Sequence, residues 1–124
     1  MTSIHFFSAT SGGRTVVEAF LKKDIKNDRE LQTALVAHLQ TIEQSSIQTL
    51  RETQRIEHIT ESIYSYRFRV TKGGTRWVRL LLAFWPNDTE ITILHLLVKK
   101  TNTLTKHDKD QAKTKFRNLQ SRRR

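Results

Sequence analysis

The sequence predicts an α+β fold in which two N-terminal helices pack on a small antiparallel sheet, followed by a basic C-terminal helix. Three observations lead to this prediction. Residues 64–71 alternate between apolar and polar side chains, which is the two-residue period of a half-buried strand. Residues 31–42 instead space their apolar side chains as one face of a helix. Glycines at positions 73 and 74 separate two strand-like segments, as in a hairpin turn.

The first 60 residues predict one short strand and two helices. Residues 4–7 are apolar and predict a strand, either at the edge or in the middle of the sheet. A turn at residues 10–13 follows, where Ser11 can cap the next helix. That helix places Val17, Phe20, Leu21 and Ile25 at helical spacing. The second helix follows a cap at Asp28 and ends at residues 45–46, and its apolar stripe is Leu31, Leu35, Leu39 and Ile42. Residues 47–59 indicate a loop with a short helical piece.

Three strands are predicted next, at residues 64–71, 76–85 and 90–98, with a second turn at residues 86–88. The first strand has an apolar face and a cationic face that includes Arg67 and Arg69. The third is apolar on both faces, which indicates a central strand or one covered on both sides. Residues 106–120 fit a helix with a weak apolar stripe of Ala112, Phe116 and Leu119. The predicted order is β-α-α-β-β-β-α. Without a repeat or a linker, residues 1–124 are expected to form one domain, with a basic C-terminal helix and tail at 105–124.

The positive charge is concentrated in the second half of the chain. Residues 1–66 hold 7 Lys or Arg and 8 Asp or Glu, whereas residues 67–98 hold 5 and 2, and residues 99–124 hold 10 and 2. Such an asymmetric field attracts a polyanion to one surface. Arginine also suits phosphate, because its planar fork donates two hydrogen bonds and keeps its charge. A solvated, solubilising surface is the alternative interpretation, but the clustering favours contact with nucleic acid or the ribosome.

Composition excludes several other classes of protein. The chain has no cysteine, which excludes disulfides, thiolate metal sites and cysteine nucleophiles. Its histidines and carboxylates are scattered without a metal-binding spacing, so we expect no metal and no cofactor. No apolar run approaches the roughly 18–20 residues that span a bilayer, and the N-terminus lacks the features of a signal peptide. We therefore expect a cytoplasmic protein with no membrane partner.

Several segments resemble a known family. Residues 14–23, RTVVEAFLKK, are similar to the first helix of RelE/HigB-type toxins of type II toxin–antitoxin systems. The segments YSYRFRV at 64–70 and WVRLLLAF at 77–84 are similar to two strands of these toxins, and residues 94–119 are similar to their last strand and helix. The phage-associated HigB-like branch is the most similar. The resemblance implies a RelE-like fold and a toxin that enters the ribosomal A site, contacts rRNA and cleaves mRNA. A cognate antitoxin, expected to be a helix-turn-helix DNA-binding protein, would neutralise it.

The chain departs from the pattern of this family at three places. Ser65 replaces a glutamate that commonly precedes the strand arginine, which removes a possible internal partner or base. Val16 replaces a proline, and residues 103–105 replace a Lys-Thr-Pro motif. The last two changes concern helix starts and leave the chemistry untouched.

RNA cleavage without a metal uses the 2′-hydroxyl as nucleophile and needs groups that deprotonate it, stabilise the phosphoryl oxygens and protonate the 5′-oxygen. The resemblance implies that Arg67 and Arg69 are paired basic residues, that Arg79 clamps the phosphate, and that a lysine acts as an acid or an electrostatic stabiliser. The candidate catalytic residues are Arg67, Arg69, Arg79, His95, Lys99 and Lys100. Candidate residues for RNA or ribosome binding are Lys72, Arg76, Lys106, Lys109, Lys113, Lys115, Arg117, Arg122, Arg123 and Arg124.

Alternation adds geometric expectations to these candidates. Lys99 shares parity with His95, so these two belong together, and Lys100 points away unless the strand has ended. Arg79 lies among apolar residues and needs a partner, either an acid such as Glu61 or a bound phosphate. The central expectation is that residues 67, 69, 79 and 99 converge in one positively charged hollow.

Other interpretations stay open. His95 is alternatively a hydrogen-bonded core histidine, and Trp77 and Trp85 either stack on bases or, as favoured here, pack in the core. The whole protein is alternatively a ParE-like poison of DNA gyrase, or a phage protein that binds a host factor or RNA without cleavage. The number of cations on adjacent strands favours the nuclease.

Overall fold

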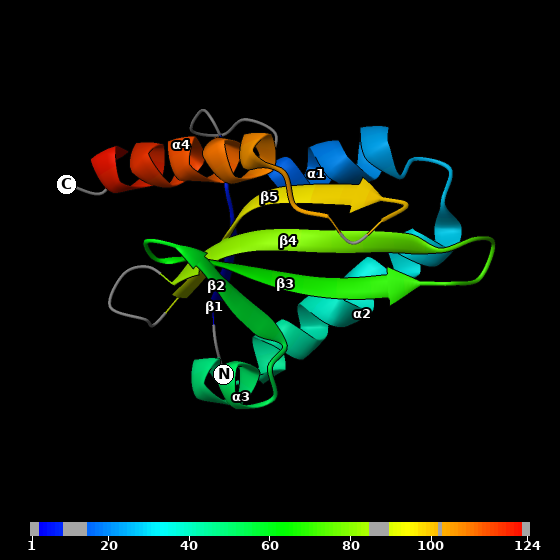
Figure 1. The fold of residues 1–124 in the computed structure, drawn as a ribbon, viewed down its shortest axis with the longest axis horizontal. Coiled ribbons are helices and arrows are strands. Elements are labelled where there is room, and N and C mark those ends of the chain that lie inside the picture. The colour runs from blue at the N-terminus through cyan, green and yellow to red at the C-terminus, as the bar shows by residue number, and fades with distance from the viewer. Residues whose placement is uncertain (1–2, 9–14, 85–89, 102, 123–124) are drawn as a thin grey trace.

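The structure is a computed structural model that describes residues 3–8, 15–84, 90–101 and 103–122, and it has an α+β fold (Figure 1). The described elements are β1 (Ser3–Phe6), α1 (Val16–Ala19), the π-helical turn η1 (Phe20–Asp24), α2 (Arg29–Gln44), α3 (Ile47–Glu52), β2 (Ile56–Thr60), β3 (Ile63–Val70), β4 (Arg76–Phe84), β5 (Glu90–Lys99) and α4 (Lys106–Arg122). The predicted α+β class is confirmed. The predicted turns at residues 10–13 and 86–88, including Ser11, lie outside the described residues.

The five strands form one sheet in the order β1-β5-β4-β3-β2. β3 pairs with β4 and β4 with β5 in antiparallel fashion, as predicted, and β2 is antiparallel to β3. β1, however, pairs with β5 in parallel, from Ser3 opposite Glu90 to Phe6 opposite Ile93. The expectation of a purely antiparallel sheet is therefore wrong at this edge. A short apolar run identifies a strand but not its direction, because direction depends on how the distant chain returns to the sheet.

The predicted element order lacks one strand. Residues 47–59 contain the expected short helix, α3, but β2 follows it and pairs with β3 at the other edge of the sheet. Within β2 only Ile56 is buried, and the adjacent Glu57 and His58 are exposed. An edge strand with one buried residue gives little alternating hydrophobicity, so its sequence resembles that of a loop.

Each N-terminal helix begins after a capping side chain, which is Thr15 for α1, where Ser11 was predicted, and Asp28 for α2. Thr15 Oγ1 accepts a hydrogen bond from the Glu18 backbone at 3.2 Å, and Asp28 Oδ1 accepts one from the Leu31 backbone at 3.1 Å. Both bonds satisfy amides that would otherwise lack a partner in the first helical turn. The predicted cap at Asp28 is confirmed. The β3–β4 hairpin also forms as predicted, with φ of 81° at Gly73 and 108° at Gly74, values that favour glycine.

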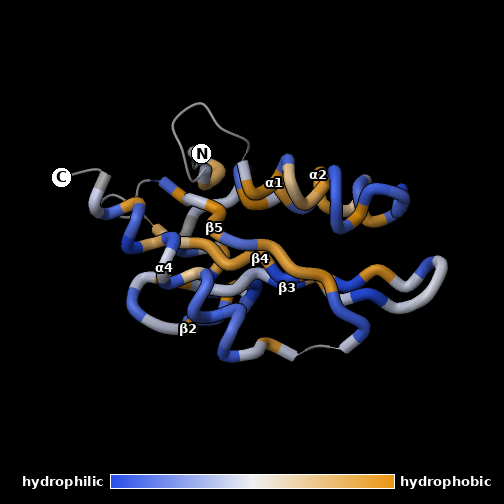
Figure 2. Tube along the Cα trace, turned by 90° about the horizontal axis from the view of Figure 1, so that it is seen from above, coloured by the Kyte–Doolittle hydropathy of each residue, from blue (hydrophilic) through white to orange (hydrophobic). Residues whose placement is uncertain are grey.

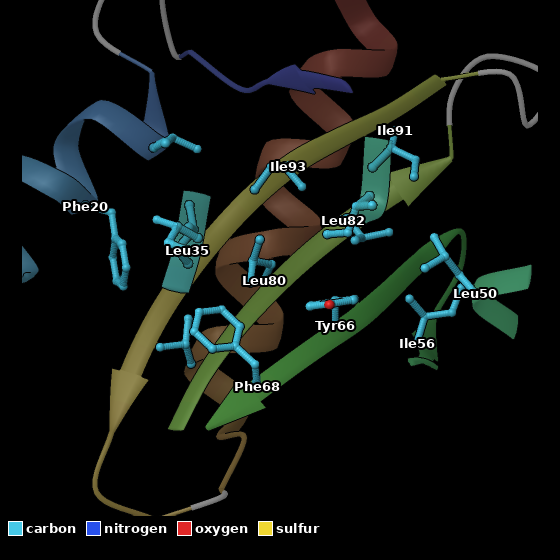
Figure 3. Close-up of a cluster of buried hydrophobic side chains, with 14 of the residues drawn as sticks. Phe20, Leu35, Leu50, Ile56, Tyr66, Phe68, Leu80, Leu82, Ile91 and Ile93 are labelled. Carbon is cyan, nitrogen blue, oxygen red and sulfur yellow. The ribbon is translucent and has the colours of Figure 1, made fainter. Parts of the chain in front are cut away.

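One face of the sheet packs against α1, η1, α2 and α3. Phe20 of η1 and Leu35 of α2 lie in one core cluster with Tyr66 of β3 and with Leu80 and Leu82 of β4 (Figure 3). Figure 2 shows α1 and α2 along this side of the strands. On β3 and β4 every second residue belongs to this cluster, as Tyr66 and Phe68 or Leu80 and Leu82 do, so the side chains between them point to the opposite face.

The opposite face is covered by α4 over part of its length. Figure 3 shows α4 behind the sheet, on the side away from the first core. Full burial of a large apolar side chain contributes roughly 1.5–3 kcal/mol, so the predicted stripe on α4 is enough to anchor this helix. The second core comprises Phe7, Ile63, Leu81, Ala83, Leu94, Leu97, Ala112, Phe116 and Leu119. Among the described residues, no helix combines the length and apolarity needed to cross a membrane.

Candidate nucleic-acid interface

The sheet face that α4 covers in part carries cationic side chains where α4 does not cover it. Arg67 of β3 lies directly opposite Arg79 of β4, and Arg69 lies opposite Trp77, which in turn faces Lys99 of β5. Side chains directly opposite each other on antiparallel strands have Cβ atoms about 4.5–5.5 Å apart. The four cations predicted to act together therefore lie on one face, in adjoining rows of the sheet. We call Arg67, Arg69 and Arg79 the arginine face.

The three residues of the arginine face differ in exposure. Arg67 and Arg69 are exposed, whereas Arg79 is only 7% exposed. The guanidinium carbon of Arg69 lies 5.3 Å from the centre of the Trp77 ring, a cation–π contact that orients the arginine. Trp77 is half-buried beneath it. Trp85, the other tryptophan, lies outside the described residues.

Arg79 has a neutral partner and an acidic neighbour. Its Nη1 donates a hydrogen bond to Ser65 Oγ at 3.1 Å. Burial lowers the pKa of Arg79, the charge of Arg67 lowers it further, and the charge of Glu57 on β2 opposes both effects. The expected acid, Glu61, instead lies 3.4 Å from Arg117. Sequence reasoning therefore anticipated an internal partner for Arg79 but named the wrong acid.

A narrow hollow lies beside the arginine face, at the β2 edge of the sheet. Glu57, Ser65 and Arg67 line it together with residues 54–56. Glu57 lies directly opposite Ser65 in the β2–β3 register, which places its carboxylate on the same face as the arginines. Of the four cations, only Arg67 is among the described residues that line this hollow. Arg79 is buried beside it, and Lys99 contacts Asp108 instead. The four cations therefore share one face, but this hollow does not unite them.

Lys99 and His95 lie together, as their parity predicts, and both contact Asp108 of α4. Lys99 Nζ lies 2.8 Å from Asp108 Oδ2, and His95 Nε2 lies 3.6 Å from Asp108 Oδ1. Asp108 also forms a reciprocal cap with Thr105, whose hydroxyl donates to Oδ2 at 2.7 Å and accepts from the Asp108 backbone at 3.2 Å. Lys100 follows the end of β5 and is exposed.

The electrostatics of Asp108 show how firmly this contact is held. Burial alone would raise the pKa of the Asp108 carboxyl, but the hydrogen bonds from Lys99 and Thr105 and the charge of Lys99 outweigh burial and lower it to about 2. The carboxylate is therefore charged at neutral pH. We call Lys99, Asp108 and Thr105 the helix latch, because they join the end of β5 to the start of α4.

His95 is enclosed by α4 on two sides. Besides Asp108, it contacts Lys115, whose Nζ donates to Nδ1 at 3.0 Å. Burial and the charge of Lys115 lower the pKa of His95 against the opposing effect of Asp108, and burial lowers the pKa of Lys115. This environment matches the alternative of a hydrogen-bonded core histidine better than an open catalytic position.

The other cations predicted to bind RNA are dispersed. Arg76 points to the face of the sheet that packs against α2, where its Nε lies 2.8 Å from Oδ2 of Asp28, the residue that caps α2. Lys72 is exposed in the hairpin, and Lys106, Lys109, Lys113 and Arg117 lie along α4 at exposed or half-exposed positions. Arg122 ends α4, and Arg123 and Arg124 lie outside the described residues.

Sequence reasoning missed Glu57 and Asp108. Asp108 had a usable signal, because Thr105 and Asp108 have the spacing of a capping pair before the basic helix. Glu57 had no local signal, since its role depends on a strand pairing that the sequence pattern did not indicate. Among the described residues, no group of three or more His, Asp or Glu side chains is placed to hold a metal ion.

Comparison with known proteins identifies a family. A family model described as phage derived protein Gp49-like (DUF891) matches residues 23–117, which include α2, α3, the strands β2 to β5 and most of α4. No curated protein and no solved structure matches the chain.

Proposed function

This chain belongs to the phage-derived Gp49-like family, which is a RelE/HigB-type toxin-like family. From this premise we propose that it is the toxin of a type II toxin–antitoxin pair and that it cleaves mRNA on the ribosome. The observation that supports this most is the arginine face, where two exposed guanidiniums adjoin a buried one on neighbouring strands. Such a surface is costly to maintain without an anionic ligand, because like charges lie directly opposite one another.

In this proposal the arginine face holds the scissile phosphate. Arg67 and Arg69 donate to the non-bridging oxygens, while Arg79, fixed by Ser65, supplies a positive charge from within the sheet. The 2′-oxygen attacks the adjacent phosphorus and the bond to the 5′-oxygen breaks, which leaves a 2′,3′-cyclic phosphate and a 5′-hydroxyl. Lys99, His95 and Lys100 are the candidates for stabilising charge on the leaving oxygen, at the other end of the same face. Of these, Lys99 and His95 also contact Asp108 and fasten α4.

The proposed partners follow from the same premise. The mRNA in the ribosomal A site and the surrounding rRNA are polyanions, and the exposed cations of α4 and the C-terminal tail would strengthen their capture. A cognate antitoxin would neutralise the toxin by blocking this surface. Its helix-turn-helix character is part of the proposal and is best sought in the neighbouring gene.

Primer extension on mRNA in a translating extract tests the proposal. We expect the wild-type protein to produce cuts that require ribosomes. Arg67→Ala should reduce their rate by about 10²–10³-fold, because it removes one preorganised donor to the developing charge. Arg67 is exposed, so folding stability should change by no more than about 0.5 kcal/mol.

Arg29→Ala is a matched control, because it removes the same charge from exposed α2 on the other side of the sheet. It should cut like the wild type. Intact mRNA with inhibited DNA supercoiling would instead identify a gyrase poison. Intact mRNA that is nevertheless bound would identify a non-catalytic RNA-binding protein, and either result would reject the nuclease.

A further inference from the structure

We infer that Glu57 is the general base of the cleavage proposed above, an inference that rests on that proposed function. The feature behind it is a carboxylate on a face otherwise lined with arginines. Glu57 lies opposite Ser65, Ser65 accepts the hydrogen bond from Arg79, and Arg67 lines the same hollow. A phosphate bound by Arg67, with Arg79 beneath it, would therefore lie beside this carboxylate.

The position of Glu57 suits a base better than a structural ion-pair partner. Its side chain is exposed at the rim of the hollow, whereas a residue that only neutralised Arg79 would be expected beneath the surface with it. The charge of Glu57 nevertheless acts on buried Arg79. The carboxylate is thus close enough to the arginine face to meet a bound nucleotide and open enough to receive its hydroxyl.

Other acids near this face are already engaged in structural contacts. Asp108 accepts hydrogen bonds from Lys99 and Thr105, and Glu61 lies against Arg117. His95, the predicted candidate, is enclosed between Asp108 and Lys115. Arginine is a poor base because its guanidinium stays protonated. Among the described residues, these contacts leave Glu57 as the acid that the register places beside the phosphate site.

The Glu57 carboxylate takes the proton of the 2′-hydroxyl as O2′ forms a bond to phosphorus. The bond between phosphorus and O5′ then breaks, and O5′ takes a proton from solvent or from an adjacent lysine. Glu57 later returns its proton to solvent. No oxidant, reductant or metal takes part, and a correctly placed base contributes about 10²–10⁴-fold in rate.

The test measures single-turnover cleavage of ribosome-bound mRNA at neutral pH for the wild type, Glu57→Gln and Glu57→Asp. We expect Glu57→Gln to lower the rate by about 10²–10⁴-fold, because the amide cannot take the proton of the 2′-hydroxyl. Glu57→Asp should retain part of the wild-type rate, because the base is present but displaced. Binding of mRNA by the Gln variant should be equal or tighter, since a negative charge has been removed.

Glu43→Gln, at an exposed position of α2, is the matched control and should cleave like the wild type. If Glu57→Gln cleaves normally, or if Glu57→Asp is as slow as Glu57→Gln, Glu57 is at most a positioning residue and the inference is wrong while the nuclease stands. If the wild-type protein produces no cuts at all, the proposed function fails and the inference fails with it. The wild-type reaction therefore distinguishes the two failures.

Discussion

Two groups of cations lie on one face of the sheet, and they differ in the acids around them. In the helix latch, Lys99 lies 2.8 Å from Asp108, and the same carboxylate approaches His95. On the arginine face, Arg67 and Arg69 are exposed to solvent, and Arg69 rests on a tryptophan ring. The first group fastens a helix, whereas the second presents charge. Net charge alone does not distinguish these uses, but the position of each acid does.

The largest effect we expect is on stability, from Asp108→Ala. The pKa of Asp108 falls from 3.8 to about 2 on folding, and this shift corresponds to about 2 kcal/mol of folding free energy at neutral pH. Because the folded-state pKa is the lower one, this stabilisation is complete above the ordinary value of 3.8 and is lost as pH falls toward 2. Urea denaturation between pH 2 and 7 measures it.

The variant should therefore be less stable than the wild type at pH 7, with the difference shrinking as the pH is lowered. Asp110→Ala, an exposed position on the same helix, is the control and should change stability little at either pH. An Asp108→Ala protein with the stability and pH dependence of the wild type would mean that the latch does not fasten α4.

A smaller difference should separate two adjacent lysines. Lys99→Met removes the hydrogen bond to Asp108, whose loss we expect to cost about 1 kcal/mol after allowing for the partial exposure of the pair. Lys100→Met, one residue further on and exposed, should leave stability within about 0.5 kcal/mol of the wild type. Thermal unfolding of both variants provides the measurement. Equal losses would show that Lys99 is an ordinary surface cation and would remove the contrast between the two groups.

The same comparison shows how far the sequence could predict the site. Strand alternation placed Arg67 and Arg69 on one face correctly, because side-chain direction in a strand is a local property. The family resemblance, not alternation, grouped Arg79 of the next strand with them, and the register confirms that it lies on the same face. It also paired His95 with Lys99. It could not place Glu57 beside Arg79 or Asp108 beside Lys99, since these contacts depend on strand order and on how α4 docks. Cations were therefore located from the sequence, but their acidic neighbours were not.

The fold was predictable to a similar extent. The hairpin at the two glycines and the helix α2 are both confirmed, because each is determined by residues that are adjacent in the sequence. β2 has too little buried surface to produce a pattern, and the parallel pairing of β1 depends on residues about 90 positions away along the chain. The prediction that residues 67, 69, 79 and 99 meet in one hollow is wrong for the same reason, because it also depends on how distant elements dock. Four cations on one face form an open surface when α4 covers only part of the sheet.

The smallest effect concerns electrostatic capture, for which Arg69 and Arg29 offer a matched pair. Both are exposed arginines, but Arg69 lies on the proposed phosphate-binding face and Arg29 on the helical side. The logarithm of affinity for single-stranded RNA falls with the logarithm of salt concentration by about 0.7 per phosphate contact. Fluorescence anisotropy with an RNA oligonucleotide, between 50 and 200 mM salt, should show a slope reduced by about that amount for Arg69→Ala and unchanged for Arg29→Ala. Equal changes in both variants would mean that RNA responds to the overall charge, and the arginine face would then have no special part in binding.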